Sequence, residues 1–184
     1  MIERRATGYA EVMAATEEKR LPTFVAIDFE TSGNYRGAAC AVGLVRVVNG
    51  RVTRRVRQLI RPPKPYIMYT DVHGITWNDV RNKPDFGEAW PILAPVLEGA
   101  DFLVAHNASF DKGVLYGCCE FYGLTPPDLP FRCTVQLARR VLNIRPAHLA
   151  NVCRVLGLKL NHHEPLSDAQ ACAQIALAAL RAAP

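Results

Sequence analysis

Two carboxylates spaced two residues apart, Asp28 and Glu30, are the first residues of the chain whose pattern points to chemistry. They follow an apolar, partly β-branched run over 24–27, which is typical of a buried strand. Because side chains alternate along a strand, both carboxylates should point to one side while Phe29 points to a core on the other. Such close like charges repel each other, and oxygen ligands suit Mg²⁺ or Mn²⁺. The pattern predicts a cation site; a strand that simply ends in a solvated loop is the alternative.

A further acid follows the next short apolar run, 102–105, which predicts a second buried strand. After His106 the chain should turn into a helix that Asn107 or Ser109 can cap. Asp111 then lies in the first helical turn, where the helix dipole favours a carboxylate. A first-turn acid without function would look the same.

The third group is His163, Pro165 and Asp168. Proline suits the first position of a helix, so His163 should lie in the preceding loop and Asp168 in the first turns. A helical carboxylate is held rigidly, as a metal ligand needs, and a loop histidine can accept a proton near neutral pH. The alternative is an ordinary surface histidine beside His162.

The rest of the sequence predicts an α/β fold. Strands are expected at 39–48 and 51–60, joined by a tight turn at 49–50. The strand at 51–60 is rich in arginine, which is typical of an edge strand protected against pairing with another chain. The further expected elements are a short helix after Thr76, helices at 86–97, 110–122, 134–141, 147–156 and 165–183, and a short strand at 131–133. Antiparallel strands followed by alternating helices and strands indicate a mixed sheet with helices on both faces.

Length and composition bound the class of protein. The 184 residues, 49% of them hydrophobic, suit one globular domain over 21–184, with 1–20 as a leading helix or frayed arm. No apolar stretch or signal segment predicts a membrane, so the expected location is cytoplasmic. The six cysteines have no zinc or redox spacing and are expected to be free core thiols. A net charge of +5 is compatible with a polyanionic partner.

Taken together, the three acidic groups occur in an order that resembles the DEDDh family of 3′-5′ exonucleases. This family includes the proofreading subunit of the bacterial replicative polymerase. The segments 28–33, 106–111 and 163–169 resemble its three motifs, and 73–76 resembles a common segment between the first two. The likeness runs over 24–180, which is nearly the whole chain.

The resemblance implies a ribonuclease H-like fold with a mixed five-stranded sheet and two divalent cations, Mg²⁺ or Mn²⁺. By analogy Asp28 binds both ions, Glu30 and Asp168 complete one site, and Asp111 supports the other. His163 would deprotonate the attacking water, with His162 as the rival base.

The resemblance also implies contacts to the 3′-terminal nucleotide. These are expected from Thr31, Ser32 and Gly33, with His106 and Asn107 contributing. Ala41 departs from the family pattern, because many relatives carry an acid in this strand. It is not a metal ligand by the analogy, so the expected activity stands.

The leading expectation is therefore a metal-dependent exonuclease that releases nucleoside monophosphates from the 3′ end of DNA. The nearest alternative is an exoribonuclease that trims short or structured RNA. A catalytically inactive module that binds nucleic acid or docks on a polymerase is the other alternative, and the presence of all five expected catalytic residues argues against it. The expected partners are a nucleic acid 3′ end and a DNA polymerase or repair protein.

Overall fold

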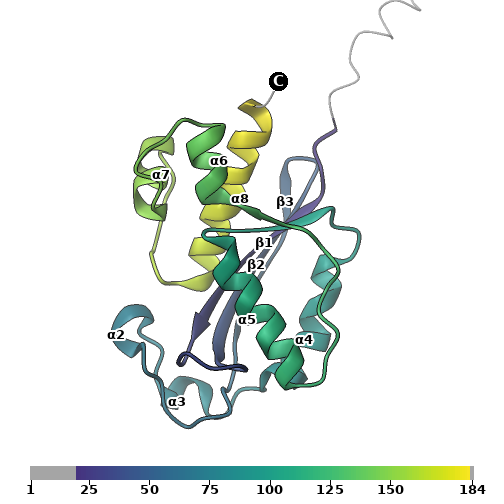
Figure 1. Cartoon of the computed structure of the whole chain (residues 1–184), viewed down its shortest axis with the longest axis vertical. Helices are drawn as coiled ribbons and strands as arrows, with labels where there is room; N and C mark the ends of the chain where they lie inside the picture. The colour runs from purple at the N-terminus through teal and green to yellow at the C-terminus, as the bar shows by residue number, and fades with distance from the viewer. Residues whose placement is uncertain (1–19, 183–184) are drawn as a thin grey trace, which may run out of the picture.

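The computed structural model describes residues 20–182, and Figure 1 shows one mixed sheet between two layers of helices. The arm expected over 1–20 lies outside the described residues, except for Arg20, which is exposed and belongs to no helix or strand. Strands and helices alternate after the first three strands, as the sequence predicts.

The sheet has five strands in the order β3-β2-β1-β4-β5. Their bounds are β1 Phe24–Thr31, β2 Ala39–Val48, β3 Arg51–Leu59, β4 Phe102–Ala105 and β5 Phe131–Cys133. The first three strands pair antiparallel, and β1 pairs parallel with β4, as β4 does with β5. Asn49 and Gly50 adopt positive φ, 46° and 75°, in the β2–β3 turn. This confirms the predicted mixed five-stranded sheet and its tight hairpin.

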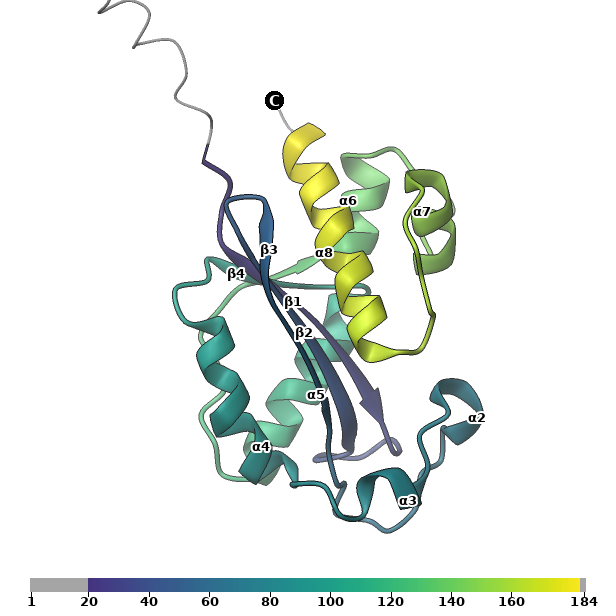
Figure 2. The ribbon, with the colours of Figure 1, turned by 180° about the vertical axis from the view of Figure 1, so that it is seen from behind.

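Helices cover both faces of the sheet. Their bounds are α2 Thr70–His73, α3 Trp77–Val80, α4 Phe86–Leu93, α5 Ala108–Phe121, α6 Thr134–Arg140, α7 Leu149–Leu156 and α8 Pro165–Ala182, with a 3₁₀ turn η1 at Ala94–Leu97. One apolar cluster joins α4, η1 and α5 to the sheet, and a second joins α6, α7 and α8 to its other face. Figure 2 shows α2 and α3 beyond the sheet, near the end of β1.

Some predicted boundaries were wrong for local reasons. The helix expected over 86–97 ends at Leu93 and tightens into the 3₁₀ turn, where Pro95 has no N–H to continue the helical bonds. The helix expected from residue 147 begins at Leu149, because the His148 ring accepts a bond from the Asn151 amide, 3.2 Å, and caps it. The short helix α2, which precedes the expected helix after Thr76, was not predicted.

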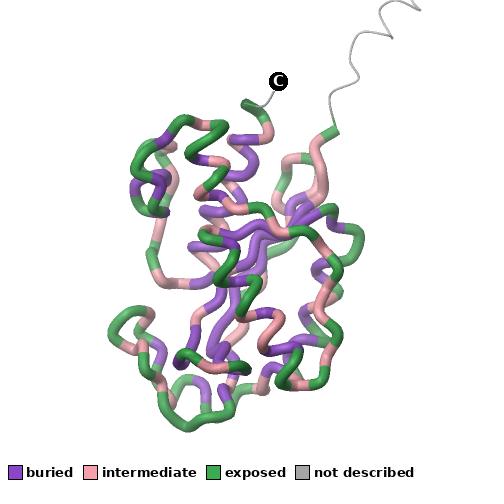
Figure 3. The backbone as a smooth tube through the Cα atoms, in the orientation of Figure 1, coloured by how far each residue is buried: buried purple, intermediate pink, exposed green. Residues whose placement is uncertain are grey.

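Burial differs between the sheet and the short helices beyond it. Figure 3 shows buried chain concentrated in the sheet and along α8, and mostly exposed chain around α2 and α3. All six cysteines lie in the described part of the chain and are free thiols, five of them buried. None of the helices within 20–182 is both long and apolar enough to cross a bilayer.

Candidate active site

The end of β1 presents the first two carboxylates. Asp28 and Glu30 are the half-buried residues of a strand that is otherwise buried. Phe29, between them, is 3% exposed and belongs to the apolar cluster on the opposite face. The strand therefore sends both carboxylates to one side, as the alternation predicts.

The start of α5 brings the third carboxylate to β1. Asn107 adopts the left-handed conformation, φ 62°, and the helix begins at Ala108, two residues earlier than predicted. Asp111 lies in its first turn, and its Oδ1 accepts a hydrogen bond from the Phe29 amide, 3.0 Å. This bond ties α5 to β1 directly beside Asp28, although 82 residues separate the two partners.

The start of α8 supplies the fourth carboxylate. Asp168 is 4% exposed, and its Oδ2 accepts a hydrogen bond from the His163 amide, 3.1 Å. Its other oxygen, Oδ1, is buried and has no hydrogen-bond partner within the described residues. Buried polar atoms are normally paired, so an orphaned carboxylate oxygen in an acidic cluster fits a metal ligand.

Gly43 allows α8 to reach this position. It pairs with Asp28 in the β1–β2 register. A Cβ at this position would lie 2.1 Å from the carbonyl oxygen of Pro165 and 2.6 Å from the Leu166 amide nitrogen. Only glycine lets the first turn of α8 rest on the sheet here, and this close approach carries Asp168 towards Asp28.

The four carboxylates lie close enough to interact electrostatically. Burial, followed by the charges of Asp111 and Asp168, raises the pKa of Asp28 well above its usual range. Burial and the Asp168 charge raise the pKa of Glu30 to about 8. Burial raises the pKa of Asp111 to about 7 and also raises the pKa of Asp168. Acids that disfavour one another's ionisation form a site that a bound cation stabilises.

The two histidines before α8 lie against Asp168. His163 adopts a positive φ of 67° in the loop, and its ring stacks on that of His162 with centroids 3.9 Å apart. His162 Nε2 lies 3.8 Å from Asp168 Oδ2. The loop position predicted for His163 is confirmed, and both rings reach the acidic cluster.

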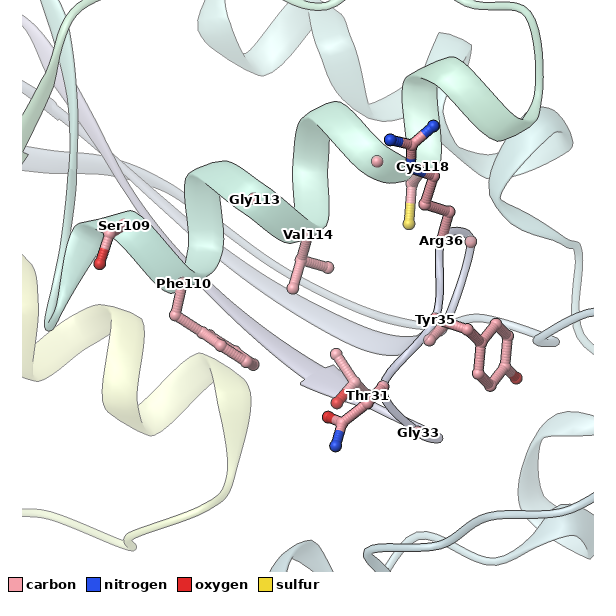
Figure 4. Close-up of a pocket in the computed structure, with 13 residues that line it drawn as sticks. Thr31, Gly33, Tyr35, Arg36, Ser109, Phe110, Gly113, Val114 and Cys118 are labelled. Atoms are coloured by element: carbon pink, nitrogen blue, oxygen red, sulfur yellow. The ribbon is translucent and has the colours of Figure 1, made fainter.

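A cavity of about 440 Å³ adjoins this cluster. Thr31, next to Glu30, and Phe110, next to Asp111, both line it, as do Gly33 and Tyr35. In Figure 4 the ring of Phe110 extends from α5 towards Thr31 at the end of β1. Phe110 is 47% exposed, so this aromatic face is open to a ligand.

Three of the residues expected to contact substrate make contacts inside the protein. Ser32 is fully buried, with its hydroxyl 2.6 Å from the Tyr35 hydroxyl. His106 Nδ1 lies 2.8 Å from the Thr134 hydroxyl, and burial lowers the pKa of His106 to about 4. Asn107 is exposed, accepts a hydrogen bond from the Ser109 hydroxyl and does not line the cavity. The cavity thus includes Thr31 and Gly33 of the predicted set.

Two contacts near the site were missed by sequence reasoning. The Ile75 amide donates to His73 Nδ1, 3.1 Å, so Nε2 carries the proton and donates to the Thr31 carbonyl, 3.2 Å. Arg57 donates to Glu164, 2.7 Å, and fixes the residue after His163. The resemblance at 73–76 was a signal from which the first contact could have been found, whereas nothing local to β3 indicated the second.

The chain is similar in sequence to known exonucleases and to parts of DNA polymerases. Residues 25–176 match a family model, RNase_T, described as Exonuclease. Exodeoxyribonuclease 10 of Escherichia coli strain K12 is 32% identical over 151 residues, which are 77% of this chain and 61% of that protein. The PolC-type DNA polymerase III of Thermotoga petrophila is 31% identical over 159 residues, 84% of this chain. The chain spans only 12% of that polymerase, and 28% of a related Mycobacterium tuberculosis protein.

Solved structures agree in fold. Exonuclease X in complex with 5′ overhanging duplex DNA has a TM-score of 0.70 at 26% identity, covering 86% of this chain and 91% of that one. The nuclease domain of 3′hExo, a DEDDh family member bound to rAMP, has a TM-score of 0.73 at 16% identity, covering 89% and 94%. The predicted ribonuclease H-like fold is confirmed.

Proposed function

The chain belongs to the exonuclease family, and we propose that it hydrolyses phosphodiester bonds at the 3′ end of DNA with the help of divalent metal ions. The observation that carries this proposal is the convergence of four carboxylates from β1, α5 and α8, with the buried Asp168 Oδ1 left without a partner within 20–182. An acidic cluster repels a phosphodiester unless cations neutralise it, so the site and its substrate both require metal.

Asp28, Glu30, Asp111 and Asp168 would hold the ions, for which we propose two Mg²⁺ or Mn²⁺. Such ions supply charge neutralisation at the scissile phosphate and a more acidic attacking water. The carboxylates themselves are held by the structure. Asp111 is fixed by the Phe29 amide and Asp168 by the His163 amide, so two ligands keep their orientation before any ion binds.

His163 is the proposed general base. It lies in a loop next to Asp168, and imidazole is the side chain that most often accepts a proton from an attacking water. His162 stays the rival, because its Nε2 is directed at Asp168 Oδ2. The spacing of five residues from His163 to Asp168 matches the family motif and favours His163.

The cavity beside the carboxylates is the proposed site for the 3′-terminal nucleotide. A volume of about 440 Å³ is within the usual range for a small ligand, and the Phe110 face offers stacking for any base. Gly33 and the Thr31 backbone lie at the other wall, and the His73 bond to the Thr31 carbonyl keeps this wall in place. A pocket of this size beside the metal site suits removal of one nucleotide at a time.

DNA is the proposed substrate because similar proteins are named for DNA or were solved with it. Exodeoxyribonuclease 10 and the DNA-bound exonuclease X structure share 32% and 26% identity with this chain. The likeness to PolC-type polymerases supports a polymerase as a partner, with a repair protein as the other candidate. A cytoplasmic location, where bacterial DNA is replicated and repaired, belongs to the same proposal.

The test is degradation of 5′-labelled single-stranded DNA and RNA of matched sequence with Mg²⁺ or Mn²⁺, beside an Asp111→Ala control. We expect a metal-dependent ladder that shortens from the 3′ end of DNA and is absent from the control. Faster shortening of RNA would make the chain an exoribonuclease. Intact binding without shortening of either strand would support the inactive-module alternative.

A further inference from the structure

The charges of the chain are unevenly distributed along it. No acidic residue occurs between Glu30 and Asp71. The basic residues in this interval are Arg36, Arg46, Arg51, Arg54, Arg55, Arg57, Arg61 and Lys64. Half of them lie on β3, so this one strand carries a concentrated positive charge.

The other basic residues of the interval are engaged elsewhere. Arg36 pairs with Glu120, and Arg61 lies 3.4 Å from Asp85. Arg46 donates to the Val96 carbonyl, and the Lys64 ammonium lies over the Tyr35 ring. Each of these four residues therefore already has a partner within the protein.

The β3 arginines are Arg51, Arg54, Arg55 and Arg57, and all four are exposed on the edge strand of the sheet. Within residues 20–182, only Arg57 of these makes an ion pair, with Glu164. Arg55 bonds the neutral side chain of Gln170 on α8, 3.2 Å. Three positive charges on this edge are thus left uncompensated in the described structure.

The strand register connects this edge to the carboxylates. Asp28 pairs with Gly43, and Gly43 pairs with Arg57, so the three residues form one row across the sheet. Directly paired residues point to the same face, so Arg57 lies beside the Asp28 position and points to the α8 face, as does Arg55.

Arg54 and Arg51 pair with Arg46 and Val48, so they flank the same edge from the opposite face. Arg51 lies six residues from Arg57, or roughly 20 Å at 3.3 Å per residue. In Figure 2 the β2–β3 hairpin lies far from α2 and α3, at the opposite end of the sheet.

We propose that the β3 arginines bind the phosphodiester backbone of the DNA strand that leads into the active site. The inference rests on the proposed function. Guanidinium groups bind phosphate oxygens in a bidentate manner, and arginine is the usual residue for this task. An edge of roughly 20 Å is as long as about six nucleotides stacked at a rise of 3.4 Å each. The edge thus extends the binding site well beyond the terminal nucleotide in the cavity.

The test compares two triple variants that lose the same charge. The first is Arg51→Gln, Arg54→Gln, Arg55→Gln, in which Arg57 is kept because it holds Glu164. The matched control is Arg139→Gln, Arg140→Gln, Arg145→Gln, three exposed arginines at the end of α6 and in the loop after it. Both are made with Asp111→Ala to prevent hydrolysis, and their affinity for labelled single-stranded DNA of two to twelve nucleotides is measured against salt.

In the control variant, the affinity for single-stranded DNA should rise with the length of the strand up to roughly eight nucleotides. About six of these would lie along β3 and the others in the active site. The β3 variant should lose this gain, so its affinity for the longer strands should be about 10- to 100-fold lower than that of the control at 0.1 M salt. The slope of log affinity against log salt should fall by roughly 2, since each lost phosphate contact contributes about 0.7. Hydrolysis of a dinucleotide, measured with Asp111 intact, should be the same as in the unmodified protein.

Equal salt slopes in the two variants would overturn the proposal. So would a β3 variant that only self-associates, because the arginines would then serve to prevent edge pairing. Failure of the proposed function gives a different result, namely no hydrolysis of any strand or dinucleotide by the unmodified protein. The binding measurement does not depend on that outcome.

Discussion

Gly43→Ala tests how the fold positions the carboxylates without altering any of them. The added Cβ would lie 2.1 Å from the Pro165 carbonyl oxygen and 2.6 Å from the Leu166 nitrogen, both backbone atoms that cannot rotate away. Ordinary contact begins near 3.4 Å, so the first turn of α8 must withdraw by about 1 Å. Asp168 moves with it, because its amide is bonded to the Glu164 carbonyl in that turn, 3.0 Å.

Two effects of different size should follow. Overpacking of this kind lowers the free energy of unfolding by ~1–3 kcal/mol. For a domain of this length that corresponds to a fall in Tm of about 2–12 °C. A displacement of about 1 Å at a reacting centre costs on the order of 100-fold in rate. Gly43→Ala should therefore stay folded at 25 °C and lose most of its turnover.

Val42→Ala is the matched control for Gly43→Ala. Val42 is fully buried and belongs to the apolar cluster on the other face of the sheet. Truncation of Val42 should lower the free energy of unfolding by a similar ~1–3 kcal/mol but leave α8 in place. Thermal unfolding and kcat on labelled DNA are measured for both variants. Equal kcat in the two variants at equal stability would refute the role of the glycine contact.

Three further results are expected. The raised pKa values of Glu30 and Asp111 mean that the folded, metal-free protein keeps protons that the unfolded chain has lost, so its Tm should fall from pH 4.5 to about 8. Mg²⁺ should restore it at pH 8, and a Tm independent of both pH and Mg²⁺ would contradict the shared site. His163→Ala should lower kcat by at least 100-fold and leave DNA affinity unchanged, and a greater loss with His162→Ala would identify that residue as the base. Phe110→Ala should raise KM by roughly 5- to 150-fold, because stacking of one base on an aromatic ring contributes ~1–3 kcal/mol of binding free energy. An unchanged KM would exclude stacking in the cavity.

Local patterns predicted most of the framework. The alternation around Phe29 gave the two faces of β1, and the Asn49-Gly50 turn gave the β2–β3 hairpin. The proline at the start of α8 correctly separated His163 in the loop from Asp168 on the helix. These features depend on residues close in sequence, where strand alternation, turn geometry and helix starts determine the conformation.

The site depends equally on contacts between distant residues, and these were not predicted. In the sequence Gly43 looks like an ordinary strand residue. Its role appears only when α8 packs on it, through Pro165, which lies 122 residues further along the chain. Ser32 has a hydroxyl that suits substrate binding, yet the chain folds back and buries it against Tyr35. From its sequence context Phe110 is equally consistent with a core residue, and only its place in the exposed cavity wall makes it a candidate ligand contact.

The number of Mn²⁺ ions that the chain binds shows whether its four carboxylates form a metal site. It can be measured by electron paramagnetic resonance of free Mn²⁺, with a saturating nucleoside 5′-monophosphate present. We expect two ions per chain, fewer in Asp168→Asn and no tight binding in Asp28→Asn, while His163→Ala keeps both. Absence of saturable binding, or binding that Asp28→Asn leaves unchanged, would contradict the claim that these carboxylates form a metal-dependent active site.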